Sequence, residues 1–400
     1  MILRPLRKVL TVGAAAGIGY TAYSADSLED VKHLGVFRFG RAALTVGKIV
    51  VDYKMSLSGI PEPSEKFDEE IRKCHQRSAD YLLDLACTNG GVFIKVGQHI
   101  AAMEYLIPPE YTDTLQVLMA RAPQAPQKDV QFVIENEFGR PIHEIFADFS
   151  EKPVGAASLA QVHIAHLKNS GEKVAVKVQH KRVYQNSKTD MNTMQFLANF
   201  ADAVFPEFKL MWLVDEVKRN LPKELDFEHE AKNADEARKR FKHLDFLKIP
   251  EIRYDFTTKR VLTMEYCEGC HVDNLEYLKK HSISPRDVCK KIGKTISEMI
   301  FLQGFLHSDP HPGNILINPK KNGYEIVLLD HGLYLNINDH IRKMYSDLWM
   351  AILKPDMQEI RKVANQMGVG ELYGLFACIV TRRSWKSVTS GIDNSKNGRR

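Results

Sequence analysis

The length and composition of this 400-residue chain already exclude some classes of protein. Its hydrophobic content of 44% can fill a large core, and its length predicts two or three structural units without any disulfide framework among its six cysteines. The net charge is only +5 and the basic residues are scattered, so we expect no nucleic-acid partner, which would need a concentrated basic surface.

Residues 1–25 have the composition of a targeting or membrane segment. They contain no acidic residue, and Arg4, Arg7 and Lys8 precede the apolar run 9–25. A mitochondrial presequence, a secretory signal and a short membrane anchor all show this pattern. The run is rich in Gly and Ala and lies near the lower length limit for crossing a bilayer. We favour mitochondrial import, with the segment either cleaved or kept as an anchor, because a secretory route would expose the six cysteines to oxidation.

Residues 26–140 are expected to form a helical extension. Apolar and charged residues alternate at helical spacing from Glu65 to Cys87, and a Gly-Gly pair at 90 then interrupts the pattern. A second helix is predicted over residues 92–103, and a shorter one through residues 130–138. Gly97 inside the second helix costs on the order of 1 kcal/mol relative to alanine, so it indicates close backbone approach.

Residues 141–266 are expected to form a smaller lobe with strands. β-branched runs predict strands over residues 174–179 and 260–266. Between them, Pro222 is predicted to start a helix that carries Glu224, Asp226 and Glu230, since proline suits the first turn of a helix.

Residues 267–385 are expected to form a second, mainly helical lobe. A CxxC at Cys267 and Cys270 is compatible with a redox pair or half a zinc site, but no second ligand pair follows, so we favour two ordinary thiols. Helices are predicted from Pro285 to Phe301 and again from Asn338.

A tight hairpin is predicted between those helices, with strands at residues 315–317 and 326–329 joined by a turn over 319–323. The polar tail 386–400 is predicted to be disordered. Strands first and helices later describe an α+β fold with two lobes.

The residues that suggest chemistry lie on both sides of this hairpin. Asp309 is followed after four residues by Asn314, and Asp330 comes sixteen residues later at the end of an apolar strand. The hairpin should bring Asn314 and Asp330 to the same end. Phosphoryl transfer uses one carboxylate near the attacking group, while an Asn and a second Asp hold Mg²⁺ (or Mn²⁺) against the nucleotide phosphates.

Lys177 in the strand Val174–Gln179 is predicted to contact the phosphates of ATP. A lysine in an apolar strand needs a carboxylate partner, and Glu230 is the natural candidate. On a helix, Asp226, Glu230 and Asn233 would share one face.

Met264, Glu265 and Tyr266 end the second predicted strand before a glycine. That position corresponds to a kinase hinge, where backbone groups would bind adenine and Met264 would lie behind it.

Two features exclude an ordinary protein kinase. The loop before Lys177 is Gly155-Ala156-Ala157-Ser158-Leu159-Ala160 where a GxGxxG loop is expected, and no Ala-Pro-Glu follows Asp330. The alanine-rich loop, the Glu224-Leu225-Asp226 triplet and Lys95-Val96-Gly97-Gln98 together resemble the UbiB (aarF-domain) atypical kinases, over roughly residues 30–385.

The resemblance implies a protein-kinase-like fold with an N-terminal helical extension that lies across the cleft as a regulatory lid. It implies that Lys95, with Gln98 beside it, meets Glu224 or Asp226. It further implies that Ala156, Ala157 and Ser158 form the loop over the nucleotide, that Lys177 pairs with Glu230, that Asp309 is the catalytic acid, and that Asn314 and Asp330 bind the metal.

The function expected from this resemblance is that of a mitochondrial atypical kinase or ATPase, of the phosphotransferase class, that binds Mg-ATP at the inner membrane. Such a protein would act in lipid or ubiquinone homeostasis or in membrane maintenance, with a membrane lipid or isoprenoid-like ligand and mitochondrial proteins as partners. Two alternatives remain open: a pseudokinase that binds nucleotide and regulates partner proteins, and a protein Ser/Thr kinase.

Overall fold

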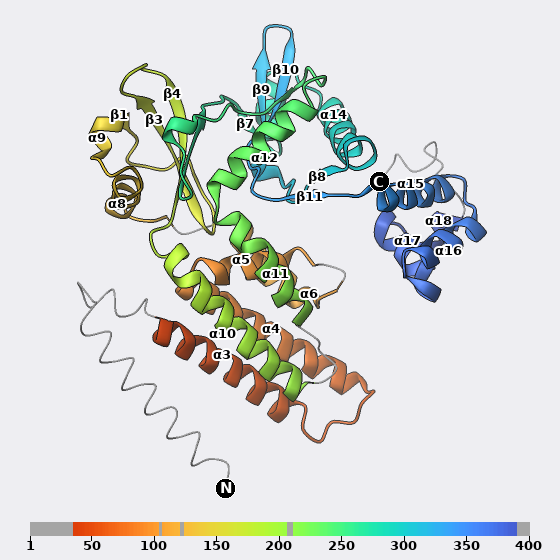
Figure 1. Ribbon diagram of the computed structural model, residues 1–400. Coiled ribbons are helices and arrows are strands. Elements are labelled where there is room, and N and C mark those ends of the chain that lie inside the picture. Colours follow the sequence, from red (N-terminus) through yellow and green to blue (C-terminus); the bar gives the residue numbers. More distant parts are fainter. Residues whose placement is uncertain (1–34, 104–105, 121–123, 206–210, 390–400) are drawn as a thin grey trace. The chain divides into compact units, whose positions relative to one another are not determined.

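The computed structural model describes residues 35–103, 106–120, 124–205 and 211–389 (Figure 1). The predicted targeting segment 1–25 and residues 390–400 of the predicted tail lie outside these ranges. None of the helices in the described ranges has both the length and the apolar character that crossing a bilayer requires.

The described part of the chain divides into two compact units, the first up to residue 228 together with residues 252–266, and the second with residues 229–251 and those from 267 onward. The first unit therefore contains both the predicted helical extension and the strands of the predicted smaller lobe. Residues 229–251 were predicted to belong with those strands, but they group with the second unit, where their strand β5 (Leu247–Lys248) pairs with β10 (Gly323–Leu328).

The helices of the first unit confirm the predicted helical region. They are α3 (Gly35–Ser56), α4 (Glu65–Asn89), α5 (Val92–Ala101), α6 (Pro109–Leu115), α7 (Val117–Ala120), α8 (Gln127–Phe138), α9 (Ile142–Ile145), α10 (Val183–Val204) and α11 (Met211–Glu224). Figure 1 shows α3, α4 and α10 side by side, with α5 nearby. Helix α4 begins where Ser64 Oγ accepts the N–H of Phe67 at 3.1 Å, and it ends at Gly90 with a φ of 67°.

Gly97 lies at a close contact between helices, as its position in α5 predicted. A methyl group added there would lie 2.4 Å from Leu118 Cδ1 of α7. Both residues are buried, so a larger side chain would have to displace Leu118.

The sheet of the first unit has the order β1-β3-β4-β6, with β2 paired to β3. Its strands are β1 (Phe146–Phe149), β2 (Gly155–Ala156), β3 (Ala160–Leu167), β4 (Lys173–Gln179) and β6 (Val261–Glu265), and a short 3₁₀ helix covers Tyr254–Phe256. Every pairing is antiparallel. Alternate residues of β4, among them Val174 and Val176, pack with Val133 and Ile134 of α8 in a buried core. The two predicted strands are confirmed.

The predicted helix start at Pro222 is wrong. Pro222 lies inside α11, whose buried residues Val217 and Leu221 extend the helix to Glu224 although proline cannot donate a backbone hydrogen bond. The next helix, α12 (Phe227–Arg240), begins after Asp226, whose Oδ1 accepts the N–H of Glu228 at 3.1 Å. Asp226 therefore precedes α12 and does not belong to a stripe on its surface.

The second unit contains most of α12 and a small sheet of order β5-β10-β9-β7. Its further elements are β7 (Cys270–His271), α13 (Leu275–Lys280), α14 (Pro285–Ser297), a π-helical turn (Glu298–Gln303), β8 (Phe305–His307), a 3₁₀ turn (Pro312–Asn314), β9 (Ile315–Lys320), β11 (Tyr334–Asn336), α15 (Asp339–Leu353), α16 (Met357–Gln366), a 3₁₀ turn (Gly370–Leu372), α17 (Tyr373–Thr381) and α18 (Trp385–Thr389). The predicted hairpin is confirmed as β9 and β10, which pair in an antiparallel register.

The predicted disorder from residue 386 is wrong for residues 386–389, which belong to α18. Val388 is fully buried in a cluster with Leu348 and Ile360, and the Trp385 ring lies 5.9 Å from that of Tyr373. The polar composition of this segment concealed two apolar residues, three positions apart, that fit one helix face.

Candidate functional site

Lys177 lies on the face of the first unit's sheet that is opposite the α8 core. Its neighbour Val176 is fully buried, whereas Lys177 is only partly buried. Val162 on β3 and Leu262 on β6 are opposite Lys177 in the register, and opposed residues share a face. The Lys177 ammonium lies 5.1 Å from the centre of the Phe227 ring. A cation beside apolar side chains suits a ligand with a flat ring and an anionic group.

The predicted hinge residues continue this surface. Met264 is buried and pairs with Ala175, two residues before Lys177 on the same face of β4. Tyr266 follows the end of β6, and Lys173 Nζ lies 3.9 Å from the centre of its ring. The structure therefore aligns Met264 with Lys177, while the role of residues 264–266 in adenine binding stays a prediction.

The alanine-rich loop forms a closed turn between β2 and β3. The Ala157 N–H donates to Ala160 O at 2.8 Å, and Ala157 O lies 3.1 Å from Nε2 of His180, which can donate to it. Ser158 is buried, whereas Ala156 is partly exposed. One N–H of this loop is therefore already bonded within the turn, and the role of Ala156, Ala157 and Ser158 in nucleotide binding stays a prediction.

Lys95 and Glu224 form an ion pair in the first unit. Lys95 Nζ lies 2.9 Å from Glu224 Oε2, and the two side chains are 14% and 10% exposed. The resemblance left Glu224 and Asp226 open as partners, and this contact involves Glu224. Gln98, one turn after Lys95, donates through Nε2 to Leu118 O at 2.9 Å. The KxGQ segment is thus fixed to α7 by Gln98 and to the end of α11 by Lys95.

Gln179 holds the Glu224-Leu225-Asp226 segment in place, although sequence reasoning did not select this residue. It is 1% exposed, and its Nε2 donates to the carbonyl of Leu225 at 3.0 Å. Leu225 lies between Glu224 and Asp226, so the strand of Lys177 holds the backbone between these two acids. Two signals were available in the sequence: an amide in an otherwise apolar strand, and its position two residues after Lys177.

Asn314 and Asp330 lie at the same end of the hairpin in the second unit. Ile315 begins β9 and pairs with Leu328, which ends β10. Beyond this pair, Leu329 donates its N–H to Asn314 O at 2.9 Å. The predicted placement of the two residues is therefore what the register shows.

His307 joins the loop of Asp309 to the loop of Asp330. Its Nε2 donates to Asp330 O at 2.6 Å, and its Nδ1 accepts the N–H of Asp309 at 3.1 Å. Asn314 Nδ2 donates to Asp309 O at 3.1 Å. Burial, as the main cause, holds the pKa of His307 below its ordinary value, which agrees with a ring that donates at one nitrogen and accepts at the other. Sequence reasoning missed this residue, although it begins the His-Ser-Asp segment.

Glu230 of α12 lies beside the Asp330 loop. It is 2% exposed, and its Oε1 accepts the N–H of His331 at 3.4 Å. A methyl group on Gly332 would lie 3.3 Å from Asp330 Oδ1 and 3.8 Å from Glu230 Oε2, so both carboxylates flank Gly332. Lys177 belongs to the first unit, and its predicted pairing with Glu230 stays a prediction.

The donor set around Asn314 fits a magnesium ion that completes its shell with phosphate and water. Among the described residues, no group of three or more His, Cys, Asp or Glu side chains could hold a metal by itself. The Nδ2 group of Asn314 is bonded to Asp309 O, so its Oδ1 is the atom of this amide that could act as a metal ligand. Cys267 and Cys270 are not joined in a disulfide, and they belong to no such metal group.

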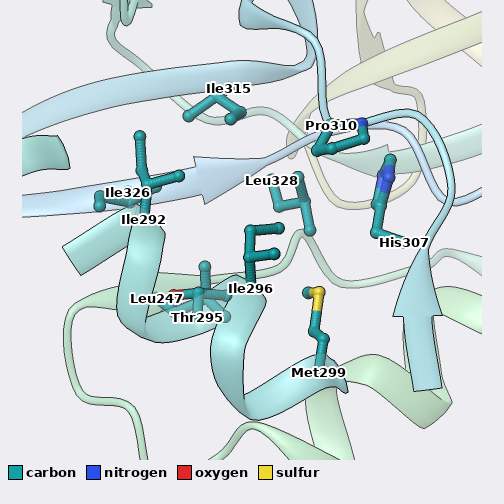
Figure 2. A pocket seen from close by; sticks show the side chains of 10 residues that line it. All are labelled: Leu247, Ile292, Thr295, Ile296, Met299, His307, Pro310, Ile315, Ile326 and Leu328. Carbon is teal, nitrogen blue, oxygen red and sulfur yellow. The ribbon is translucent and has the colours of Figure 1, made fainter. Parts of the chain in front are cut away.

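A small, mostly apolar cavity lies beneath the loop of His307 and Pro310 (Figure 2). Its volume is about 20 Å³, which is room for about one water molecule and not for a nucleotide. Met299, Ile315 and Leu328 are among the side chains around it. The polar side chains of this unit's candidate site lie instead at the end of the hairpin, with Asn314 and Asp330.

Comparisons with known proteins agree with this geometry. Residues 117–364 match the ABC1 atypical kinase-like domain. The chain is 49% identical over 365 residues to AarF domain-containing protein kinase 1 of Xenopus tropicalis, which covers 91% of this chain and 70% of that protein. It is 46% identical over 397 residues to AarF domain-containing kinase 1 of Drosophila melanogaster, covering 98% and 76%. The resemblance to aarF-domain kinases, and to the kinase 1 group within them, is confirmed.

A more distant relative is the ABC1 family protein MCP2 homolog of Schizosaccharomyces pombe, 40% identical over 394 residues, with 94% of this chain and 70% of that protein covered. Among solved structures, that of Rv3197 from Mycobacterium tuberculosis in complex with erythromycin has a TM-score of 0.50 at 24% identity, covering 75% of each chain. That likeness concerns the fold alone. Together, the matched domain, the identities of 40% or more and the α+β fold show that the chain is a member of the ABC1 atypical kinase-like family.

Proposed function

We propose that this chain is an ATP-dependent phosphotransferase or ATPase that uses Mg²⁺ or Mn²⁺. The observation that carries the proposal is the arrangement of the second unit, where Asn314 and Asp330 end paired strands and His307 joins their loops to Asp309. A hydrogen-bonded loop of this kind holds an acid and two oxygen ligands in fixed positions before substrate arrives.

Each residue has a distinct role in this proposal. Lys177 binds phosphate oxygens from its apolar strand, and Asp309 accepts the proton of the attacking hydroxyl or water. Asn314 and Asp330 would hold the metal, which supplies neutralisation of the phosphate charge when it is bound. Glu230 orients the Asp330 loop through its contact with the N–H of His331.

The Lys95 helix bears on the kind of acceptor, and the basic amino terminus bears on the location of the activity. The family resemblance implies that the helix of Lys95 lies over the nucleotide, where it would hinder a bulky protein acceptor, so we favour a small or lipid-linked acceptor over a protein. The acid-free segment 1–25 supports import into mitochondria, where a role in lipid or ubiquinone homeostasis at the inner membrane would follow.

Nucleotide binding by the purified chain tests the proposal. Thermal shift and calorimetric titration with Mg-ATP should show binding by the wild type, and about tenfold weaker binding by Lys177→Ala and by Asp330→Asn, because each loses a charged contact to the ligand. Asp273→Asn, which changes an exposed aspartate in the second unit, should bind like the wild type. Unchanged binding by both site variants would reject this site.

ATP turnover distinguishes an enzyme from a nucleotide-binding regulator. Asp309→Asn should bind Mg-ATP like the wild type but lose at least about 10²-fold in turnover, the usual contribution of a catalytic proton acceptor. Wild-type turnover should be measured with and without membrane lipids. Equal restoration of function in cells by wild type and Asp309→Asn would favour the pseudokinase, and strong transfer to a Ser/Thr peptide would favour a protein kinase.

A further inference from the structure

His331, which follows the predicted metal aspartate, is fixed at both ring nitrogens. The ring is 2% exposed, with Nε2 at 3.0 Å from Leu328 O and Nδ1 at 3.0 Å from the hydroxyl of Tyr334. A carbonyl oxygen can only accept, so the hydrogen is on Nε2 and the Tyr334 hydroxyl donates to Nδ1. Both contacts therefore depend on a single orientation of the ring.

Tyr334 is held in turn by the strand before the catalytic loop. It begins β11 and pairs with His307 at the end of β8. Its ring stacks on Phe305 at 4.1 Å and meets the edge of the His307 ring at 5.1 Å. Burial, and less strongly the charge of Asp330, raises the pKa of Tyr334, so its hydroxyl keeps the proton that it donates.

The backbone of the same loop is anchored on two further sides. Asp330 O accepts from His307, and His331 O accepts from Asn233 Nδ2 at 3.0 Å. The N–H of Gly332 donates to Asp330 Oδ1 at 2.9 Å, which orients the carboxylate itself. The three-residue loop is thus tied to the catalytic loop, to α12 and, through His331, to Tyr334.

We propose that His331 and Tyr334 form a latch that holds Asp330–Gly332 in its metal-binding conformation, which makes Tyr334 a positioning residue of the site. An apolar ring at position 331 could leave its place without breaking a hydrogen bond. The His331 ring cannot, because its departure leaves Leu328 O and the Tyr334 hydroxyl without partners in a buried place. The role in metal binding rests on the proposed function, whereas the latch itself is a property of the unliganded protein.

Tyr334→Phe tests the latch because it removes one oxygen atom and keeps the stacked ring. Tyr324→Phe is the matched control, since Tyr324 donates its hydroxyl to Asp287 at 2.6 Å in the same unit. Hydrogen exchange of the His331 and Gly332 amides should become roughly tenfold faster in Tyr334→Phe, the effect of losing about one buried hydrogen bond, and should not change in Tyr324→Phe. Equal exchange in the two variants would overturn the latch.

A second comparison separates the hydrogen bond from loss of packing, because the effect of Tyr334→Phe on loop exchange should disappear or reverse without His331. In His331→Phe, the Tyr334 hydroxyl loses its acceptor, so adding Tyr334→Phe should slow loop exchange or leave it unchanged. If Tyr334→Phe accelerates exchange equally in both backgrounds, the hydroxyl does not act through His331 and the proposal fails.

Mg-ATP titration of the same proteins separates the latch from the proposed function. Both ideas are supported if Tyr334→Phe weakens Mg²⁺-dependent binding roughly tenfold while Tyr324→Phe does not. If the wild type binds no nucleotide but the exchange difference is present, the latch stands and the proposed function fails. If nucleotide binds and the exchange difference is absent, the latch fails.

Discussion

Two cation–carboxylate pairs of the first unit, one buried and one partly buried, use the same chemistry with different geometry. Arg38 of α3 binds Asp190 of α10 through two contacts, Nε to Oδ1 at 2.8 Å and a terminal nitrogen to Oδ2 at 2.5 Å, and the side chains are 5% and 2% exposed. Arg38 also donates to the Asn89 carbonyl at the end of α4. The Lys95 ammonium lies 2.9 Å from Glu224 Oε2, and this pair is more exposed.

The comparison suggests that one pair fixes the fold and the other can be released. A planar guanidinium with two bonds to a carboxylate has one geometry, and here it connects three helices. A lysine ammonium is a compact charge on a flexible stem, so it can exchange its partner for a phosphate or for water at a lower cost. Helix α5 takes part in both pairs. The centre of its Phe93 ring lies 5.6 Å from the Arg38 guanidinium, and its Lys95 is the cation of the second pair.

Breaking the arginine pair should have the largest effect. Arg38→Met leaves the Asp190 carboxylate buried without its partner and should cost about 3–5 kcal/mol of unfolding free energy in a urea titration. Arg77→Met is the control, because its pair with Asp52 is 40% and 22% exposed and should contribute about 1 kcal/mol or less. Similar losses in the two variants would remove the distinction between a fixed pair and an exposed one.

Changing the packing of α5 should have an intermediate effect. Gly97→Ala puts a methyl group 2.4 Å from Leu118 Cδ1 and should cost about 1–3 kcal/mol. Gly47→Ala in α3 meets no atom within 4 Å and should instead stabilise the protein by about 0.5–1 kcal/mol. Adding Leu118→Ala should reduce the effect of Gly97→Ala. Thermal unfolding of the wild type, the two single variants at positions 97 and 118 and the double variant would show this. Additive losses would mean that the Leu118 contact is not the cause.

Breaking the Lys95–Glu224 pair should change the free energy of unfolding less than it changes the affinity for nucleotide. Lys95→Met should cost about 1 kcal/mol, because Lys95 and Glu224 keep more access to solvent than Arg38 and Asp190 do. If Lys95 belongs to a lid, the affinity for Mg-ATP should change by about tenfold, a larger effect than the stability predicts. The exchange Lys95→Glu with Glu224→Lys should restore much of the pair, whereas Arg38→Asp with Asp190→Arg should not, since Asn89 would lose its donor. A purely structural Lys95 would change unfolding and leave nucleotide affinity unchanged.

The sequence was informative wherever one local rule decided the structure. The strand of Lys177, the hairpin of Asn314 and Asp330 and the contact at Gly97 followed from β-branched runs, a turn and one costly glycine. The prediction of a helix start at Pro222 was wrong, because the apolar face of α11 outweighed the preference of proline for a first turn. The prediction of disorder was wrong for residues 386–389, because the buried Val388 holds α18 against the preceding helices.

The missed residues of the site act through hydrogen bonds to distant backbone. Gln179 bonds to Leu225 and His307 bonds to Asp330, over separations of 46 and 23 residues. No periodicity reports such contacts, since each depends on which carbonyl the fold brings near. The Arg38–Asp190 pair spans 152 residues and was missed for the same reason.

The smallest predicted effect compares the two ends of α3 as pH falls. Near the end opposite Arg38, the Tyr53 hydroxyl lies 2.5 Å from Nδ1 of His75, and burial, as the main cause, lowers the pKa of His75. The unfolded chain then binds a proton near pH 6.5 that the folded chain does not, so stability is present above that pH and is lost as pH falls below it. Urea titrations at pH 7.5 and 5.5 should show a loss of at most about 1 kcal/mol from this residue, which His75→Gln abolishes and His340→Gln, at an exposed site, does not. Amide exchange should increase around Tyr53 before it increases around Arg38, because a guanidinium does not titrate in this range. Exchange that increases equally at both ends would show that the charged pair and the neutral cluster unfold together.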